Sequence, residues 1–182
     1  MRKILRQREL VADEWRYLEE LPEGPASLAS AGAARPALII PVAQLADAAY
    51  SSAAWAGRLG VHVESGARVE DIANDLGRLE LVAFKFPTTG DGRGYSYARL
   101  LRDRYGFRGE VRALGAVKCD QIFFMARSGF DAFELAPGED VEAAIRALSR
   151  YSVAYAPGVA HASIRAQRFH AQRSGRAISS NS

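Results

Sequence analysis

The feature that most constrains the fold of this chain is a series of short apolar runs that alternate with segments of helical length. The runs are rich in Val, Ile, Leu, Ala and Phe, as is typical of strands buried on both faces. We predict five such strands, at residues 37–42, 61–63, 81–86, 110–114 and 132–135. Strands that alternate with helices favour a parallel sheet with right-handed crossover connections.

The segments between these strands carry apolar or small residues at the spacing of a helix face. The pattern i, i+3, i+4, i+7 begins at Leu45, at Val69 and at Val141, so we expect helices that cover a sheet in these segments. A further helix is predicted to end at Gly106. The segment 121–127 is apolar nearly all round, which indicates a helix that is buried on more than one side or faces a second subunit.

These units predict an α/β domain at residues 37–155, built on a mostly parallel sheet of about five βα units. Five units are too few for a closed eight-stranded barrel. An open doubly wound sheet is the preferred architecture, and a half TIM-barrel-like fragment is the alternative. Both architectures place ligands at the carboxyl ends of the strands.

The two ends of the chain differ from this central domain. Residues 1–36 are predicted to be an N-terminal extension and linker, because residues 22–36 are rich in Pro, Gly, Ala and Ser. The first 20 residues fit neither the helix period nor the strand period, so a hairpin and a helix both stay open. We expect this piece to pack on the sheet edge or to exchange with a partner. Residues 156–182 are predicted to be a basic, disordered tail.

Composition limits the class of protein. The 182 residues, 48% hydrophobic and 25% charged, suit one globular domain. No apolar run reaches the roughly 18 residues of a membrane span, and the charged N-terminus lacks the apolar stretch of a signal peptide. We therefore expect a cytoplasmic protein without membrane association. Cys119 is the only cysteine, which excludes an internal disulfide and an iron–sulfur or zinc site with four thiolates from one chain.

The net charge of +3 comes from the tail, which contains four arginines and no acid. Subtracting these four positive charges from the net charge of +3 leaves −1 for the rest of the chain, which is therefore close to neutral. A basic tail can bind nucleic acid weakly by charge alone. No nucleic-acid-binding motif accompanies it, so this is the least supported function.

The stretch "FKFPTTGDGRGYSYARLL", residues 84–101, is the strongest candidate for a binding loop. Its glycine spacing fits neither the dinucleotide fingerprint G-x-G-x-x-G nor a phosphate-binding Walker loop. Glycine backbone at a helix start and an arginine fork nevertheless suit a small oxyanion. The predicted ligand-binding residues of this loop are Lys85, Asp91, Gly92, Arg93, Gly94, Tyr95 and Ser96. The alternative is structural, with Asp91 as a cap that pairs with Arg93 at the surface.

The next strand ends in a similar way, with Asp120 and Gln121 before a helical segment. If they face the same crevice as Arg93, the cluster carries both charge signs and could bind a zwitterion or transfer a proton. Asp120 could instead be a helix N-cap and nothing more.

The other reactive residue types give weaker signals. His62 lies inside an apolar run, which favours a structural histidine over a catalytic one. His161 and His170 lie in the tail without metal-ligand spacing, so we predict no metal site. Cys119 precedes an apolar run and is expected to be buried rather than reactive. No iron–sulfur, siroheme or dinucleotide motif is evident, so the cofactor and the catalytic residues stay unknown.

Residues 86–135 carry a family resemblance. The Asp91 to Ser96 run, the Ala-Arg-Leu-Leu segment that follows, Asp120-Gln121 and the Gly-Phe-Asp-Ala-Phe run at residues 129–133 resemble the bacterial domain-of-unknown-function family 934. The resemblance covers about residues 1–155. The family is commonly labelled as an oxidoreductase of sulfite reduction, and its members are often encoded beside sulfite reductase and other sulfate-assimilation genes.

The resemblance implies a role in sulfite reduction or sulfate assimilation, with a small anion or sulfur oxyanion as the ligand. Whether the chain is an enzyme stays open, because a reductase built on it would need a borrowed redox group. The alternative is a non-catalytic accessory protein that binds sulfite reductase or an electron-transfer partner. Homo-oligomers are also compatible with the apolar segment 121–127.

Overall fold

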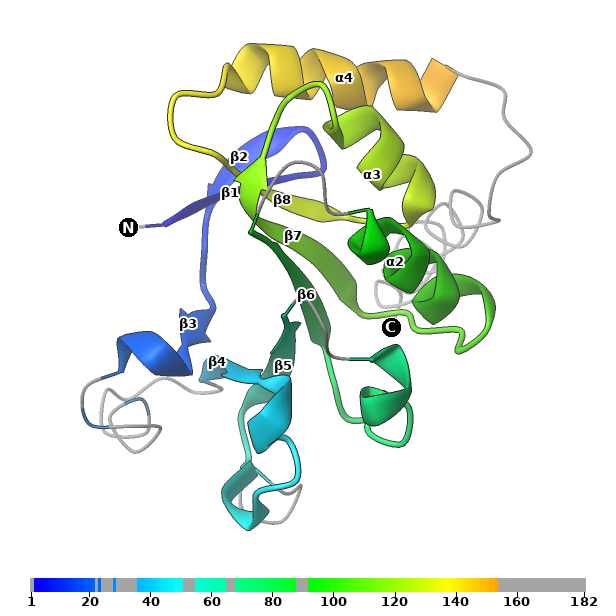
Figure 1. Cartoon of the computed structure of the whole chain (residues 1–182). Helices are drawn as coiled ribbons and strands as arrows, with labels where there is room; N and C mark the ends of the chain where they lie inside the picture. Colours follow the sequence, from blue (N-terminus) through cyan, green and yellow to red (C-terminus); the bar gives the residue numbers. More distant parts are fainter. Residues whose placement is uncertain are drawn as a thin grey trace, which may run out of the picture.

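The computed structural model describes residues 2–21, 23, 28, 36–50, 55–64, 68–87 and 92–153. In this part of the chain, one eight-stranded sheet has the strand order β2-β1-β8-β7-β6-β5-β4-β3, and α-helices pack on one of its faces (Figure 1). The strands are β1 (Lys3–Arg6), β2 (Glu9–Ala12), β3 (Arg16–Tyr17), β4 (Ala37–Pro41), β5 (Arg58–Val63), β6 (Leu81–Phe86), β7 (Glu110–Val117) and β8 (Ala132–Leu135). The helices are η1 (Leu18–Glu20), η2 (Val42–Gln44), η3 (Ala48–Tyr50), η4 (Val69–Ile72), α2 (Arg93–Asp103), α3 (Ile122–Ser128) and α4 (Val141–Val153).

The five predicted strands are confirmed as β4 to β8, and neighbours among them pair in parallel. The predicted bounds of β6 and β8 match the structure, whereas β7 continues three residues further, to Val117. This extension passes through Gly115, whose φ is +92°, and the pairing of β7 with β8 shifts register between Ala113 and Val117. A Cβ at Gly115 would lie 2.6 Å from the Phe86 carbonyl oxygen, so this irregular strand end requires glycine.

The predicted helices are confirmed on the C-terminal side and wrong on the N-terminal side. Helices α2, α3 and α4 form as expected, but the described residues after β4 and β5 form the short 3-10 helices η2, η3 and η4. The Arg78 guanidinium donates to the carbonyl oxygens of Leu45 (2.9 Å) and Tyr50. A side chain thus satisfies carbonyls that an α-helix would pair internally, and short segments gain little from helix propagation.

The N-terminal extension forms a hairpin, one of the two alternatives. Its turn residues Gln7 and Arg8 have φ of 53° and 69°, as a two-residue turn that matches the strand twist requires. Strand β1 pairs antiparallel with β2 and with β8, while β3 pairs in parallel with β4. The expected packing on a sheet edge therefore occurs at both edges. The expectation of a mostly parallel sheet is wrong, because these N-terminal strands make the sheet mixed.

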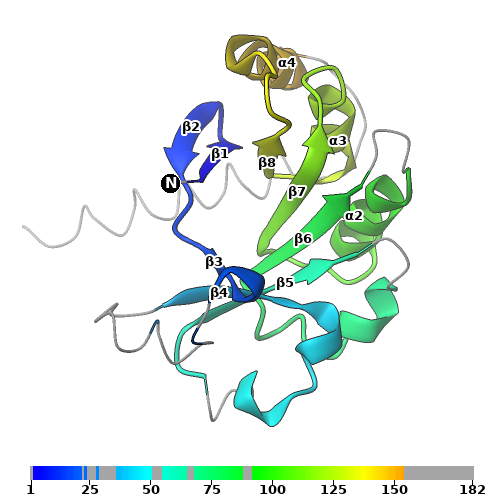
Figure 2. The same cartoon turned by 60° about the vertical axis from the view of Figure 1, so that its left-hand side comes forward.

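The short connection between β2 and β3 forces the sheet to curl. These strands lie at opposite edges, which in a flat sheet of eight strands would be about 34 Å apart at about 4.8 Å per spacing. The four-residue step from Ala12 to Arg16 can span only about 14 Å. The sheet is accordingly a half-barrel (Figure 2). The half-barrel alternative is confirmed, and the open doubly wound sheet, with helices on both faces, is wrong.

Apolar cores lie on both faces of the curled sheet. On the convex face, strand residues such as Val61 and Phe84 pack with Leu101 of α2, Met125 of α3 and Leu148 of α4. The concave face has its own cluster, which consists of Trp15, Tyr17, Ala37, Ile39, Leu81, Ala83 and Leu114. Trp15 and Tyr17 come from the N-terminal segment, so this segment fills the concave side that the helices leave open.

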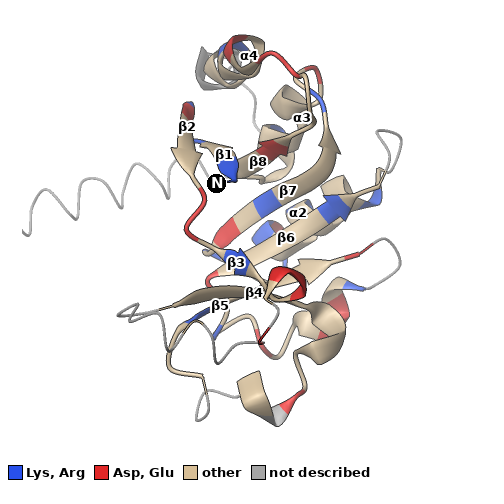
Figure 3. Ribbon diagram, turned by 90° about the vertical axis from the view of Figure 1, so that its left-hand side faces the viewer, with Lys and Arg blue, Asp and Glu red and all other residues tan. Residues whose placement is uncertain are grey.

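Buried charges also line the concave face, where acidic and basic positions lie on neighbouring strands (Figure 3). The guanidinium of Arg112 is 1% exposed and pairs with Asp13 and Glu110, each at 2.8 Å. Asp13 belongs to the connection between β2 and β3. The ion pair therefore ties that connection to β7.

The predicted boundary at residue 36 stays a prediction, although strands from both sides of it share one sheet. Most of the predicted linker and the tail from residue 154 onward lie outside the described residues. Among the helices that are described, none has the length and apolar character needed to cross a membrane.

Candidate functional site

The predicted binding loop leads into helix α2 on the convex side of the sheet. Gly92 is the N-cap of α2, and the exposed Arg93 is its first residue. Because the cap is a glycine, it has no side chain to accept hydrogen bonds from the amides of the first turn. Those amides and the Arg93 guanidinium are donors of the kind that bind oxyanions. Asp91 lies outside the described residues.

Gly94 has a packing role. A Cβ at this position would lie 2.5 Å from Cζ of Phe86, so only glycine allows α2 to approach the end of β6 this closely. Tyr95 stacks edge-on against Phe86 and Phe130, with ring centroids 5.9 Å and 6.4 Å apart. The exposed hydroxyl of Ser96 follows it on the helix. The loop is thus anchored by aromatic packing at its helical end.

Asp120, which follows β7, interacts electrostatically with Tyr95 of α2. Burial raises the pKa of the Tyr95 phenol, and the charge of Asp120 raises it further, which places the two side chains close enough to interact. Asp120 is not the N-cap of α3, because Gln121 holds that position. The Gln121 Oε1 atom accepts a hydrogen bond from the Lys118 amide at 3.4 Å. The charge of Asp120 therefore acts on Tyr95, and Gln121 rather than Asp120 caps α3.

Cys119 is half-buried rather than buried. Its amide donates to Oε2 of Glu139 at 2.8 Å. The hydrogen bond between the Cys119 thiol and the same carboxylate raises the pKa of the thiol. A raised pKa lowers the fraction of thiolate, so the thiol is not an activated nucleophile.

Lys85 does not join the predicted loop. It lies between Phe84 and Phe86 on β6, and the side chains of a strand alternate between faces. Because both phenylalanines pack on the convex side, Lys85 points to the concave side. There its Nζ atom is 3.5 Å from Oε1 of Glu64, and the Lys85 side chain is 50% exposed.

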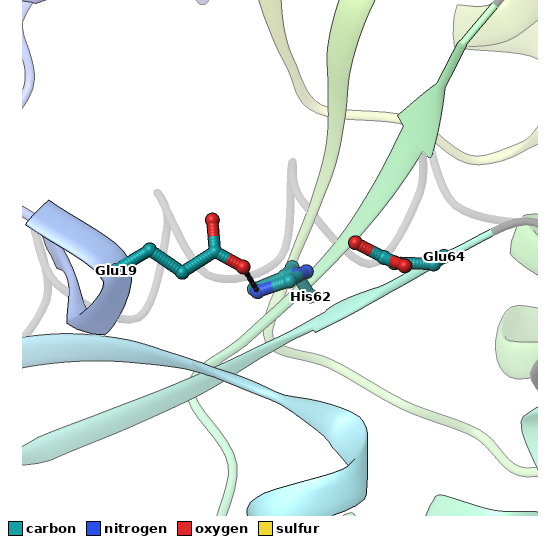
Figure 4. A group of neighbouring side chains, drawn as sticks. All are labelled: Glu19, His62 and Glu64. Atoms are coloured by element: carbon teal, nitrogen blue, oxygen red, sulfur yellow. Dashed lines mark ion pairs between the residues drawn. The ribbon is translucent and has the colours of Figure 1, made fainter.

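A second polar cluster lies on this concave side, at the carboxyl ends of β5 and β6. His62 of β5 lies between Glu19 of η1 and Glu64, the residue that follows β5 (Figure 4). The His62 Nε2 atom is 3.3 Å from Oε1 of Glu19, and the imidazole is only 3% exposed. Among the described residues, neither ring nitrogen has a hydrogen-bond partner. One ligand atom from each of the three residues lies within 4.8 Å of the others.

The electrostatic surroundings keep the His62 ring neutral. Burial lowers its pKa, Glu19 and Glu64 oppose this shift, and the Lys85 charge adds to it. A neutral imidazole offers one nitrogen lone pair as an acceptor or metal ligand. His62 is buried, as its apolar run indicates, but among the described residues no hydrogen bond satisfies its ring nitrogens. A structural rather than catalytic role for His62 stays a prediction.

Sequence reasoning did not single out Glu19 or Glu64. The pair His62 and Glu64 does carry a signal, because residues two apart on a strand point to the same face. Glu19 carries no such signal. It is 43 positions from His62 in the numbering, and only the pairing of β3 with β4 brings it near.

Other residues that carry the family resemblance have scaffold roles. The buried Arg102 of α2 donates to the carbonyl oxygens of Gly129 (3.1 Å), Phe107 (2.7 Å) and Gly109 (2.8 Å). It also pairs with the Asp131 carboxylate. Arg102 and Asp131 therefore pair with each other and with the backbone, which is a structural role.

The fold and these sites define the class of protein: an α/β half-barrel with polar clusters at the carboxyl ends of its strands, where parallel α/β sheets bind ligands. The chain belongs to domain-of-unknown-function family 934, a family of bacterial proteins of unknown function, whose model matches residues 60–165. The match covers more than half of the chain, so the expected family is confirmed, although the match begins at residue 60 within β5 and not near residue 1. No curated protein matches the chain.

Proposed function

We propose that this protein binds a small sulfur oxyanion at the amino terminus of α2 and serves sulfite reduction. The observation that carries this proposal is the glycine cap of α2 next to Arg93. The amino terminus of α2 and the Arg93 guanidinium offer donors that suit a negatively charged, oxygen-rich group. The sulfur chemistry is taken from the label that family members commonly carry.

The nearby Asp120 carboxylate refines the choice of ligand. A carboxylate beside an anion site repels a fully deprotonated ligand but accepts a hydrogen bond from a protonated one. Sulfite carries a proton at neutral pH in part of its population, whereas sulfate does not. We therefore expect hydrogen sulfite to be preferred over sulfate.

With one cysteine and no dinucleotide fingerprint, the electrons for a reduction would come from a partner's redox group. Binding of the anion does not require that the protein itself catalyses a step. The accessory role is the second candidate, and the exposed Phe124 favours it. Phe124 is 59% exposed on α3, while its neighbours Ile122 and Met125 are buried, so the helix presents an aromatic ring outward.

Isothermal titration calorimetry on the full chain tests the anion proposal. Wild type should bind sulfite more tightly than sulfate, and Arg93→Ala should weaken sulfite binding about tenfold or more, since a charge-assisted hydrogen bond contributes about 1.5–3 kcal/mol. Asp120→Asn should reduce the preference for sulfite. Arg99→Ala is the matched control, because Arg99 lies on the same helix and pairs with Asp103.

Equal sulfite binding by wild type and Arg93→Ala would contradict the proposal, as would no binding to either. Association with sulfite reductase that is retained in Arg93→Ala and lost in Phe124→Ser would point to the accessory role instead.

A further inference from the structure

The cluster on the concave side suggests a second binding function, independent of the proposed anion site. Its three residues come from η1 and from the end of β5, and the His62 ring lies between the two carboxylates (Figure 4). The helix start with Arg93 lies on the other side of the sheet. The two sites can therefore be tested separately.

His62 is the residue that distinguishes this cluster from an ordinary group of surface acids. An imidazole buried to 3% exposure normally satisfies its nitrogens with protein hydrogen bonds. Among the described residues neither nitrogen of His62 makes one, although Nε2 lies 3.3 Å from the Glu19 carboxylate. Leaving a buried polar group without a partner costs about 1–3 kcal/mol. A ligand that accepts a nitrogen lone pair would remove this cost.

We propose that Glu19, His62 and Glu64 bind a divalent transition-metal ion such as Zn²⁺ or Mn²⁺. One imidazole and two carboxylates are the ligand types that these ions take in proteins, whereas Mg²⁺ and Ca²⁺ prefer oxygen ligands alone. Three protein ligands leave a coordination position open for water or another small ligand.

The geometry needs only small adjustments. Bonds of about 2.1 Å to one ion place its ligand atoms about 3–4 Å apart, and the atoms of this cluster already lie within 4.8 Å of one another. His62 is held by its strand. The carboxylates of Glu19 and Glu64 are 54% and 62% exposed, so both can rotate toward the ion.

Lys85 competes with the metal for one of these ligands. Its Nζ atom is 3.5 Å from Oε1 of Glu64 and neutralises part of the negative charge. Binding a cation therefore requires the ammonium to move away from Glu64. Removing the positive charge of Lys85 should strengthen metal binding, an effect that a purely structural cluster would not show.

The test is calorimetry of Zn²⁺ and Mn²⁺ on the full chain after chelator treatment, with Mg²⁺ for comparison. The dissociation constant should rise about tenfold or more in His62→Asn and in Glu64→Gln. It should fall several-fold in Lys85→Met. The double variant His161→Asn/His170→Asn is the matched control, because it removes the two other histidines and should bind as wild type does. Co²⁺ should give a visible absorption spectrum in wild type that His62→Asn lacks.

Wild-type affinity in both His62→Asn and Glu64→Gln would overturn the proposal, as would loss of the binding event in the tail double variant. If His62→Asn does not fold, Glu64→Gln decides, because the exposed Glu64 side chain can be changed without disturbing the core. Mg²⁺ binding as tight as Zn²⁺ binding would also count against an imidazole ligand.

Discussion

At the residue scale, alternation along the strands determines which side chains meet. The flanking valines of His62 pack with the helices, so the imidazole is directed to the concave side with Lys85 and Glu64. The same rule separates Lys85 from Arg93, although only seven residues lie between them. One stretch of sequence thus supplies residues to both faces of the sheet.

The buried imidazole predicts a pH dependence of stability. Burial lowers the pKa of His62 below its ordinary value of 6.5, with Lys85 adding to the shift and Glu19 and Glu64 opposing it. Below pH 6.5 the unfolded chain binds a proton at His62 more readily than the folded chain does. The free energy of unfolding should therefore decrease as the pH falls from 6.5 toward the lower pKa that His62 has in the folded protein.

Urea unfolding at a series of pH values between 7.5 and 5.5, without added metal, measures this effect. His62→Gln should flatten the pH dependence in this interval, because the variant has no group there to titrate. Lys85→Met should reduce the loss of stability in this interval, since removing the cation that disfavours the imidazolium raises the folded pKa of His62 toward its ordinary value. A wild-type curve with the same slope as His62→Gln would contradict the expectation.

At the element scale, Arg102 connects α2 with the loops before β7 and β8. Its guanidinium satisfies three backbone carbonyls and pairs with Asp131. The Asp131 carboxylate also accepts the Val111 amide at 3.0 Å. This one side chain sets how the helix sits on the convex face, and with it the position of Arg93 at the other end of α2.

Removing this connection should be costly. Arg102→Met leaves the carbonyls without their donor and the Asp131 carboxylate without its cation, so we expect a loss of about 3 kcal/mol in the free energy of unfolding. Arg99→Met, on the exposed side of the same helix, should change it by about 0.5 kcal/mol or less. Urea unfolding compares the two variants. Equal losses of unfolding free energy would show that Arg102 stabilises the fold no more than an exposed arginine does.

At the scale of the whole molecule, the N-terminal segment closes the half-barrel. It supplies two strands at one edge and one strand at the other, and Trp15 and Asp13 cover the concave face between them. Without it, Arg112 would lose the Asp13 carboxylate and the apolar residues Leu81 and Ala83 would lose their cover. The segment is therefore part of the folding unit.

Deletion of residues 1–17 should abolish cooperative folding. The truncated chain would expose the concave core and two sheet edges, so circular dichroism should show no cooperative urea transition. Asp13→Ala is the milder comparison, because it leaves the strands in place. The Asp13→Ala variant should keep the fold, but its free energy of unfolding should fall by about 3 kcal/mol, because Arg112 is left buried without that carboxylate. A truncated chain that unfolds at the wild-type urea midpoint would refute this account.

The local elements were predictable to the extent that each depends on its own residues. The apolar runs at residues 81–86 and 132–135 are strands with the predicted bounds, and the stripe that begins at Val141 is a helix. The stripes that begin at Leu45 and Val69 failed as helix predictions. In the first of these segments, the Leu45 and Tyr50 carbonyls accept hydrogen bonds from Arg78, a contact with no local signal.

The sequence by itself determined the α/β character, the five central strands and the glycine-capped start of α2, because periodicity and glycine chemistry act over a few residues. Only the tertiary structure decided the curl of the sheet, since the short connection from Ala12 to Arg16 must span its two edges. It also decided that Glu19 meets His62 while Lys85 turns away from Arg93. Such meetings depend on strand pairing between residues far apart in the chain, which no local pattern records.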